Sequence, residues 1–402
     1  MRRRLFTFLA IYLMILPGCA RGNAPLEIKE KSLELNIGYF SQKHFEDRYA
    51  SLMALEYPNL QYSIVPTGDI EKGKTTLSDW FEEHQVDLIY LPAQQFQEAA
   101  NLGLLQNLDL YVERDSFPVE ALVPSVADLT RQYGNGELYG LAPTFYGSAL
   151  VYNRQIFDQY GVAYPEDRMT WKEIVSLASQ FPKGLTLPYR SAADWLIDIG
   201  RTEDLQAYNE QTDSITLNSP SWTSILESVQ EPLKQGNIAF NDINKNSFIA
   251  EKYAMAVVGY DDFKVLEQQG SEIKWKLVTM PVNPLTPETD HHVSLAGVWA
   301  IPSHSPQTDA AWELIRFFVS DRVAEWEYRS VYGFSALASH TSLGQPDSSI
   351  EAFYKQQPLI KNSGVPEQVY LLLDETVEQI LSGGKTVRQA LADMPKSLSQ
   401  AK

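Results

Sequence analysis

The stretch VDLIYLPAQQFQEAANL, residues 86–102, contains a short apolar run followed by a more polar segment. Val86–Leu91 is almost continuously apolar, which is typical of a strand that is buried on both faces of a parallel sheet. The residues that follow, Ala93–Leu102, predict a helix. A strand that leads directly into a helix is the unit from which layered α/β folds are built.

The same alternation continues toward the N-terminus. In Leu33–Tyr39 every second residue is large and apolar, a period of two that predicts a strand. A helix is expected over His44–Glu56 and should end at Tyr57, because the residue before a proline resists the α conformation. Gln61–Val65 predicts the next strand.

The pattern also extends toward the C-terminus. Thr170 and Glu173 form a capping box, in which each side chain satisfies a backbone N–H of the first helical turn, so a helix should begin there. Further strands are expected over Ala254–Val258, Lys274–Thr279 and Val293–Ile301. A chain of 402 residues exceeds what one core usually fills, so two α/β domains are expected.

The N-terminus resembles a bacterial lipoprotein signal. Three arginines precede the apolar run Leu5–Leu16, which is too short to span a bilayer but is typical of a signal peptide. Leu16-Pro17-Gly18-Cys19 looks like a lipobox, and Cys19 is the only cysteine in the chain. We therefore predict a signal peptide over residues 1–18 and a lipidated tether over residues 19–32. An ordinary secretory signal with a chance cysteine is the alternative.

Composition and motifs argue against several function classes. The net charge of −18 is opposite to what a nucleic-acid-binding protein needs. No G-x-S-x-G nucleophile elbow and no H-E-x-x-H zinc motif occur. His291 and His292 are adjacent, and on a strand they would point to opposite faces, so we expect them not to chelate a metal together. The prediction is a protein without catalytic residues, metal or cofactor.

Four stretches, in the same order along the chain, resemble the family 1 extracellular solute-binding proteins, which include maltose- and oligosaccharide-binding proteins of ABC importers. The most specific runs from GELYGL (136–141) through LVYNR (150–154) and FDQYGV (157–162) to Pro165 and TWKE (170–173). The others are Asp87–Leu105, Phe248–Met255, where Glu251 replaces the family's usual glycine, and Ser305–Ser320. The resemblance covers nearly all of Leu33–Lys402.

The resemblance implies a two-lobed periplasmic-binding-protein clamp of type II, with mixed, mostly parallel sheets and hinge segments that cross between the lobes. Carried over to this chain, lobe one would comprise residues 33–141 and 260–302. Lobe two would comprise residues 146–255 and 307–402. The hinges are expected near residues 142–145, 259–262 and 302–306.

The resemblance also implies a function. The protein would capture a small polar solute, a sugar or oligosaccharide, in the cleft and deliver it to the transmembrane subunits of an ABC permease. It would act as a monomer outside the cytoplasm, held at the bacterial cell membrane by lipid on Cys19. Three alternatives remain open: a lipoprotein that reports to a sensor kinase, the same clamp with a non-sugar ligand, and a surface polysaccharide-processing enzyme.

Candidate ligand-binding residues follow from one rule, that solutes of open α/β sheets bind beyond the carboxyl ends of the strands. Sugars are held by aromatic rings and a few polar groups. For each candidate, packing in the core is the competing interpretation. The candidates are Tyr39, Phe40, Tyr90, Gln94, Tyr146, Trp195, Tyr260, Asp261 and Trp299.

Overall fold

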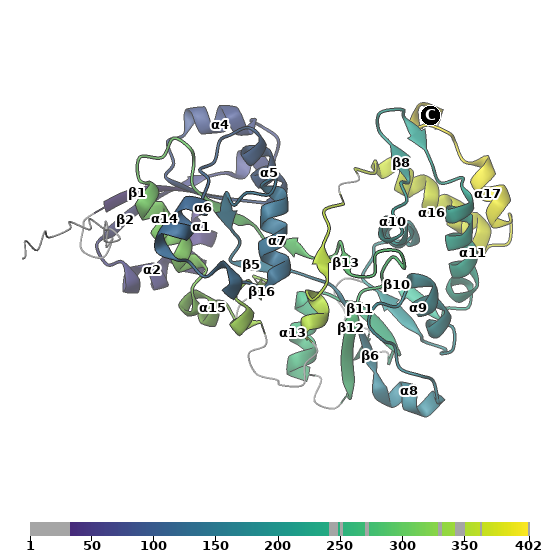
Figure 1. The fold of residues 1–402 in the computed structure, drawn as a ribbon. Coiled ribbons are helices and arrows are strands. Elements are labelled where there is room, and N and C mark those ends of the chain that lie inside the picture. The colour runs from purple at the N-terminus through teal and green to yellow at the C-terminus, as the bar shows by residue number, and fades with distance from the viewer. Residues whose placement is uncertain are drawn as a thin grey trace, which may run out of the picture.

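Two five-stranded sheets organise the chain, one in each of two lobes (Figure 1). This computed structural model describes residues 33–240, 248–249, 252–269, 273–328, 332–341, 350–361 and 364–400. Cys19 and the predicted signal peptide and tether lie outside the described residues. The two-lobed α/β architecture with mixed sheets, predicted from the sequence, is confirmed. Among the described residues, no helix combines the length and the apolar character that crossing a membrane requires.

The sheet of lobe one has the strand order β2-β1-β3-β15-β4. β1 (Leu33–Tyr39) pairs in parallel with β2 (Leu60–Pro66) and β3 (Leu88–Leu91), whereas β15 (Val298–Ala300) is antiparallel to β3 and to β4 (Gly140–Leu141). All four residues of β3 are buried, as its apolar run predicts. The helices of this lobe are α1 (Gln42–Phe45), α2 (Ser51–Glu56), α3 (Gly68–Glu71), α4 (Leu77–Glu83), α5 (Ala93–Asn101), α6 (Asp109–Asp115), α7 (Pro124–Tyr133), α14 (Thr308–Phe318) and α15 (Asp321–Glu327).

The sheet of lobe two has the order β10-β7-β11-β6-β12. β7 (Leu185–Leu187) is parallel to β10 (Ile238–Phe240) and β11 (Met255–Val258). β6 (Ala149–Asn153) runs antiparallel to β11 and β12 (Trp275–Thr279). Its helices are α8 (Arg154–Tyr160), α9 (Trp171–Ala178), α10 (Ala192–Thr202), α11 (Pro220–Lys234), α13 (Tyr260–Gln269), α16 (Glu367–Leu381) and α17 (Val387–Asp393). A short hairpin of β8 (Tyr208–Asn209) and β9 (Ser214–Ile215) completes it.

The backbone passes between the lobes in three segments. The first follows β4 and contains β5 (Thr144–Tyr146), and the second follows β12 and contains β13 (Thr289–Asp290) and β14 (Ser294–Leu295). The third follows β16 (Phe334–Ser335) and contains β17 (Gln357–Pro358). β5 lies between β14 and β16 in a three-stranded sheet, and β13 pairs with β17, so the three segments support one another.

Two of the expected hinges are therefore wrong. Residues 259–262 connect β11 to α13, and the chain then returns to the same sheet as β12. Residues 302–306 connect β15 to α14, which stays in lobe one because Phe318 stacks on Trp299 with 4.6 Å between ring centroids. The expectation that residues 260–302 belong to lobe one fails for α13 and β12, and the assignment of residues from 307 onward to lobe two fails for α14 and α15.

Predictions from local sequence patterns agree with the structure better than the predicted lobe boundaries do. Thr170 caps α9 together with Glu173, which confirms the capping box. The predicted strand over residues 293–301, however, is divided into β14 and β15, which belong to different sheets. Gly297 lies at this break, and a Cβ there would approach the ring of Tyr90 to 2.4 Å. Only glycine lets the crossing segment pass so close to that ring.

Candidate functional site

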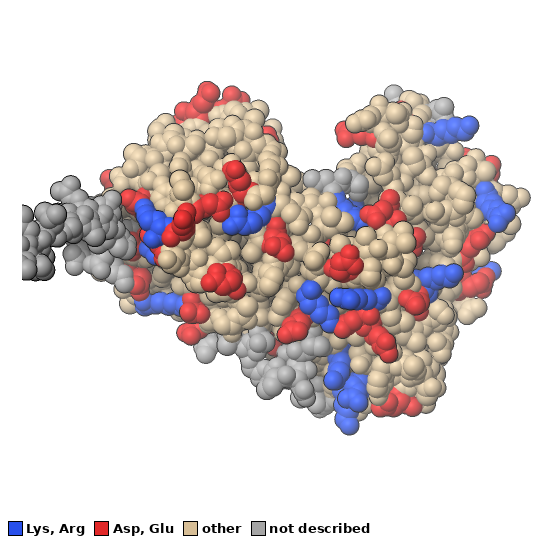
Figure 2. Space-filling view, in the orientation of Figure 1, with Lys and Arg blue, Asp and Glu red and all other residues tan. Residues whose placement is uncertain are grey.

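The surface is hollowed between the two lobes. Figure 2 shows a notch between the two lobes that opens at the top of the view, and in the same orientation Figure 1 places α7 on the lobe one side and α10 on the lobe two side. The carboxyl ends of β1 and β3 carry candidate residues of lobe one, and the carboxyl end of β11 carries those of lobe two. The candidate site is therefore described around the junction between the lobes, where these strand ends lie.

Four of the predicted residues form one aromatic cluster in lobe one. The ring centroid of Tyr39 is 4.4 Å from that of Phe40, 5.2 Å from that of Tyr90 and 5.6 Å from that of Trp299. Tyr39 and Trp299 retain only 1 % and 0 % of their surface exposed. Rings so completely covered cannot stack on a solute, so the prediction of ligand contact is wrong for both. They support Tyr90 and Phe40 from beneath.

A buried ion pair lies against this cluster. Arg48 donates from Nε to Oε1 of Glu327 at 2.5 Å and from Nη2 to Oε2 at 3.1 Å, and both side chains are at most 4 % exposed. The guanidinium lies over the ring of Tyr332 at 4.4 Å and that of Tyr49 at 4.9 Å. Its Nη2 also donates to the hydroxyl of Thr144 in β5, at 3.4 Å. Arg48 thus ties α15 and the first crossing to the helical segment that contains it.

The backbone around Arg48 is unusual. Residues Glu46–Ala50 form a π-helical turn between α1 and α2, within the single helix that the sequence predicts over His44–Glu56. Such turns insert an extra residue into a helix and occur frequently at functional sites. Sequence analysis missed this pair, because nothing local signals that Arg48 meets a carboxylate 279 positions away.

The tyrosines of the cluster remain protonated. Burial raises the pKa of Tyr39 and of Tyr90, and the neighbouring Arg48 only partly opposes the rise. Both hydroxyl groups are therefore neutral, and that of Tyr90, which keeps a little exposed surface, can donate and accept hydrogen bonds as sugar hydroxyls require.

A second group of predicted residues lies at the junction. Tyr146, in β5, is 38 % exposed, and its ring centroid is 6.3 Å from that of Tyr260 at the start of α13. Asp261 is exposed beside it, and its charge contributes to raising the pKa of Tyr146, although burial is the larger cause. The hydroxyls of Tyr146 and Tyr260 thus lie where the first crossing meets the carboxyl end of β11.

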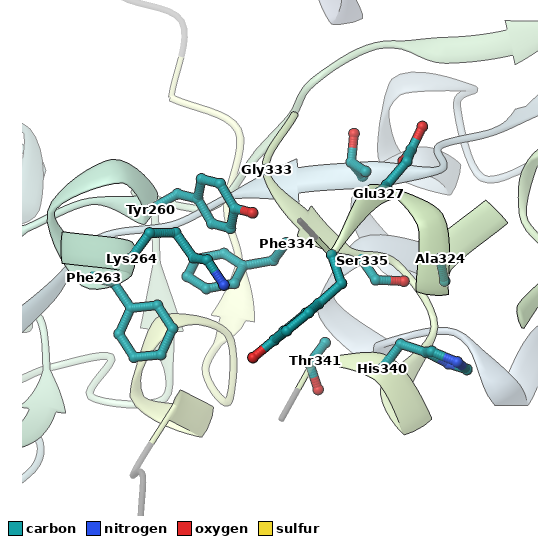
Figure 3. Close-up of a pocket in the computed structure, with 12 residues that line it drawn as sticks. Tyr260, Phe263, Lys264, Ala324, Glu327, Gly333, Phe334, Ser335, His340 and Thr341 are labelled. Atoms are coloured by element: carbon teal, nitrogen blue, oxygen red, sulfur yellow. The ribbon is translucent and has the colours of Figure 1, made fainter. Parts of the chain in front are cut away.

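A small pocket opens beneath Tyr260. Figure 3 shows Tyr260, Lys264 and Phe334 on one side of it and Glu327 and His340 on the other. Its solvent-filled volume is about 20 Å³, which accommodates roughly one water molecule. Cavities that bind small molecules measure about 300–1,000 Å³, so this pocket is not the solute site.

The two remaining candidates differ in exposure. Gln94 is exposed in the first turn of α5, just beyond the carboxyl end of β3. Trp195 is wholly buried in α10, and its ring lies edge-on to Trp171 at 5.6 Å. The prediction for Trp195 is therefore wrong, because it is a core residue of lobe two.

A polar cluster that sequence analysis rejected connects α10 to the second crossing. His291 Nε2 lies 3.0 Å from Oδ1 of Asp198, and His292 Nε2 lies 3.1 Å from Oδ2. The other ring nitrogen of His292 lies 2.5 Å from Asp290, and the hydroxyl of Tyr189 donates to Asp198 at 2.6 Å. The side chains of Asp198, His291 and His292 are 7–9 % exposed.

The geometric premise for excluding this histidine pair, that both residues lie on a strand and point to opposite faces, does not hold. His291 and His292 follow β13 instead of lying on a strand, and their ring centroids are 4.0 Å apart. Both rings consequently point to the same carboxylate. The pair was visible in the sequence, but its partner on α10 was not.

Comparison with known proteins now identifies the family. Residues 71–338 match the model of the bacterial extracellular solute-binding proteins. The melibiose/raffinose/stachyose-binding protein MelE of Bacillus subtilis is 21 % identical over 230 residues, which are 55 % of this chain and 49 % of that protein. The chain therefore spans about half the length of this curated relative.

Solved structures show the same fold. A family 1 extracellular solute-binding protein from Alicyclobacillus acidocaldarius superposes with a TM-score of 0.67 at 16 % identity, covering 89 % of this chain and 96 % of that one. The sugar-binding protein MalE from Xanthomonas citri gives a TM-score of 0.64 at 17 % identity, covering 90 % and 95 %. The family match extends over most of the chain, and the structure has the two lobes and the groove of such proteins. The chain belongs to the bacterial extracellular solute-binding proteins.

Proposed function

We propose that this protein captures a sugar or oligosaccharide in the groove between its lobes and delivers it to an ABC permease. The observation that carries the proposal is the meeting of aromatic and polar side chains from both sheets at the lobe junction, in a chain of the solute-binding family. The relative named for melibiose, raffinose and stachyose and the sugar-binding structural neighbour support a carbohydrate.

The proposed contacts are those candidates that the structure leaves accessible at least in part. Tyr146 and Phe40 offer ring surface, Tyr90 and Tyr260 offer hydroxyl edges, and Gln94 and Asp261 offer polar groups for sugar hydroxyls. Contacts from both lobes favour closure of the clamp, because a solute shifts the open–closed equilibrium only by its difference in affinity for the two states.

A thermal-shift screen with maltose, raffinose and stachyose, set beside amino acids and a dipeptide, tests the ligand class. A ligand that binds only the folded state raises the melting temperature by mass action. We expect a shift with at least one sugar and none with the other compounds. A shift with amino acids alone would replace the carbohydrate by another ligand class on the same clamp.

The contact at Tyr146 can be tested by calorimetry with the sugar that gives the shift. Tyr146→Ala is expected to weaken binding about tenfold, which corresponds to ~1.4 kcal/mol. Tyr160→Ala is the matched control, because Tyr160 is also an exposed tyrosine, 47 % accessible, but lies at the end of α8. Equal affinities for the two variants would remove Tyr146 from the site.

Two further features belong to this proposal. The protein binds its solute without converting it, so prolonged incubation with a bound oligosaccharide should yield no product. It is held at the outer face of the bacterial membrane by lipid on Cys19, so Cys19→Ser should move the protein from the membrane fraction to the medium or periplasm. We propose that it acts as a monomer.

A further inference from the structure

The histidine cluster at the second crossing has the composition of a metal site. It contains two imidazoles and one carboxylate whose donor atoms all lie within 4.8 Å of one another. We infer that Asp198, His291 and His292 bind a divalent transition-metal cation, with zinc as the preferred ion. This inference does not depend on the sugar-binding function proposed above.

The distances between donor atoms are close to those that zinc requires. Zinc binds histidine nitrogen and carboxylate oxygen at about 2.0–2.2 Å, so donor atoms of a tetrahedral site are roughly 3.3–3.5 Å apart. The oxygens of Asp198 are 3.0 and 3.1 Å from the Nε2 atoms of the two histidines. An ion bound between the three side chains would replace these two hydrogen bonds, and the donor atoms already lie within 4.8 Å of one another.

The surrounding groups already orient the ligands. Metal-binding histidines usually donate their second ring N–H to a carboxylate, which fixes the tautomer and strengthens the ligand. His292 has this arrangement, because its Nδ1 lies 2.5 Å from Asp290 while Nε2 faces Asp198. Asp198 is itself held by the hydroxyl of Tyr189. Asp290 and Tyr189 therefore form a second layer of partners that holds the ligands in place.

The charges also favour a cation. Both ring nitrogens of His292 face carboxylate oxygens, so both carry hydrogen in the metal-free protein. One imidazolium and two carboxylates then leave a net charge of about −1 in a buried cluster. A divalent cation would take the place of the Nε2 hydrogen of His292, which leaves as a proton to solvent. His291 would move its ring hydrogen to Nδ1, and the cluster would become neutral.

The donor set points to zinc rather than to calcium or magnesium. Imidazole suits zinc and its transition-metal neighbours, whereas calcium and magnesium prefer oxygen ligands. Three protein ligands would leave a fourth position for water. The ion would join α10 of lobe two to the segment that carries the chain into lobe one.

Calorimetric titration of the chelator-treated full-length protein with Zn²⁺ tests the inference, and titration with Co²⁺ adds a visible spectrum that reports four-coordinate binding. His291→Gln is the main variant, because the glutamine amide can still donate to Asp198 and keep the buried carboxylate satisfied. His84→Gln is the matched control, since His84 stacks on Trp80 in lobe one, far along the chain from the cluster.

We expect one Zn²⁺ per chain, a tetrahedral Co²⁺ spectrum, and a loss of affinity of at least tenfold in His291→Gln but none in His84→Gln. Asp290→Asn, which alters only the second layer, should weaken binding by about 10–100-fold. Circular dichroism establishes that each variant is folded. Absence of zinc binding to the parent protein, or equal affinity in His291→Gln and His84→Gln, would overturn the inference.

Discussion

The two lobes each bury a cluster of charged side chains, but they neutralise it in different ways. In lobe one Arg48 and Glu327 form a closed pair with two hydrogen bonds, surrounded by tyrosine rings. In lobe two Asp198 faces two histidines, one of which also faces Asp290. Arginine keeps its proton at any ordinary pH, whereas histidine can exchange its proton at a pH that its neighbours set.

The arginine pair in lobe one is therefore less sensitive to pH than the histidine cluster in lobe two. The pair in lobe one has equal and opposite charges joined by two hydrogen bonds, and its arginine keeps its proton, so it fastens α15 to the π-helical turn that carries Arg48. The cluster in lobe two changes its charge with pH or with a bound cation, and it lies beside a segment that connects the lobes. The following predictions compare the two, from the largest effect to the smallest.

Breaking the lobe one pair should have the largest effect. Arg48→Met removes the guanidinium that donates two hydrogen bonds to the buried Glu327, and removal of one member of a buried pair typically costs about 3–5 kcal/mol. Urea unfolding, followed by circular dichroism, measures the loss. The double variant Arg48→Met/Glu327→Leu should recover much of it, since no lone charge remains. A loss below about 1 kcal/mol in the single variant would show that the pair contributes little.

Removing His292 should cost less at neutral pH, on the order of 3 kcal/mol, and the loss should depend on pH. Burial alone would lower the pKa of His292, but Asp198 and Asp290 raise it to about 10. The contribution of His292 to stability is complete below pH 6.5, which is near its pKa in the unfolded chain. It disappears as the pH rises through about 10, its pKa in the folded protein.

Urea unfolding of the parent and His292→Gln, both with chelator, checks this dependence. The difference between their unfolding free energies should shrink steadily between pH 6.5 and 10. On the acid side, the pKa values of Asp198 and Asp290 lie below that of an ordinary aspartate, so their contribution is lost only as the pH falls through those lowered values. A difference that stays constant from pH 6.5 to 10 would contradict the assigned protonation of His292.

The smallest effect is expected for an exposed pair next to Arg48. Lys43 and Asp47 are 2.9 Å apart with side chains 81 % and 54 % exposed. Pairs this exposed contribute little to the free energy of unfolding, because water and salt screen their attraction. Lys43→Met should therefore unfold at nearly the same urea concentration as the parent protein. A loss approaching that of Arg48→Met would mean that burial is not what distinguishes the two pairs.

Much of the fold could be predicted because its signals are local. The apolar run before Pro92 gave a buried strand, and Thr170 with Glu173 gave a helix start, since each pattern depends on a few neighbouring residues. The division of residues 293–301 into two strands was not predicted, because it depends on the ring of Tyr90, which approaches Gly297 from far along the chain.

The candidate site was predicted only in part. Position near a strand end or crossing selected Tyr90 and Tyr146 but also the buried Trp299, because the rule locates a residue along the chain and does not say which way its ring points. Arg48 was missed because the rule considers strand ends only, whereas Arg48 lies within a helical segment and its partner comes from α15.

By itself, the sequence determined the α/β class, the order of most strands and helices, and membership of a solute-binding family, because periodicity, caps and family motifs are written in short stretches. Only the tertiary structure decided where the chain crosses between the lobes, which aromatic rings remain accessible, and which charges meet. These features depend on contacts between residues up to 279 positions apart, and such contacts exist only once the chain has folded.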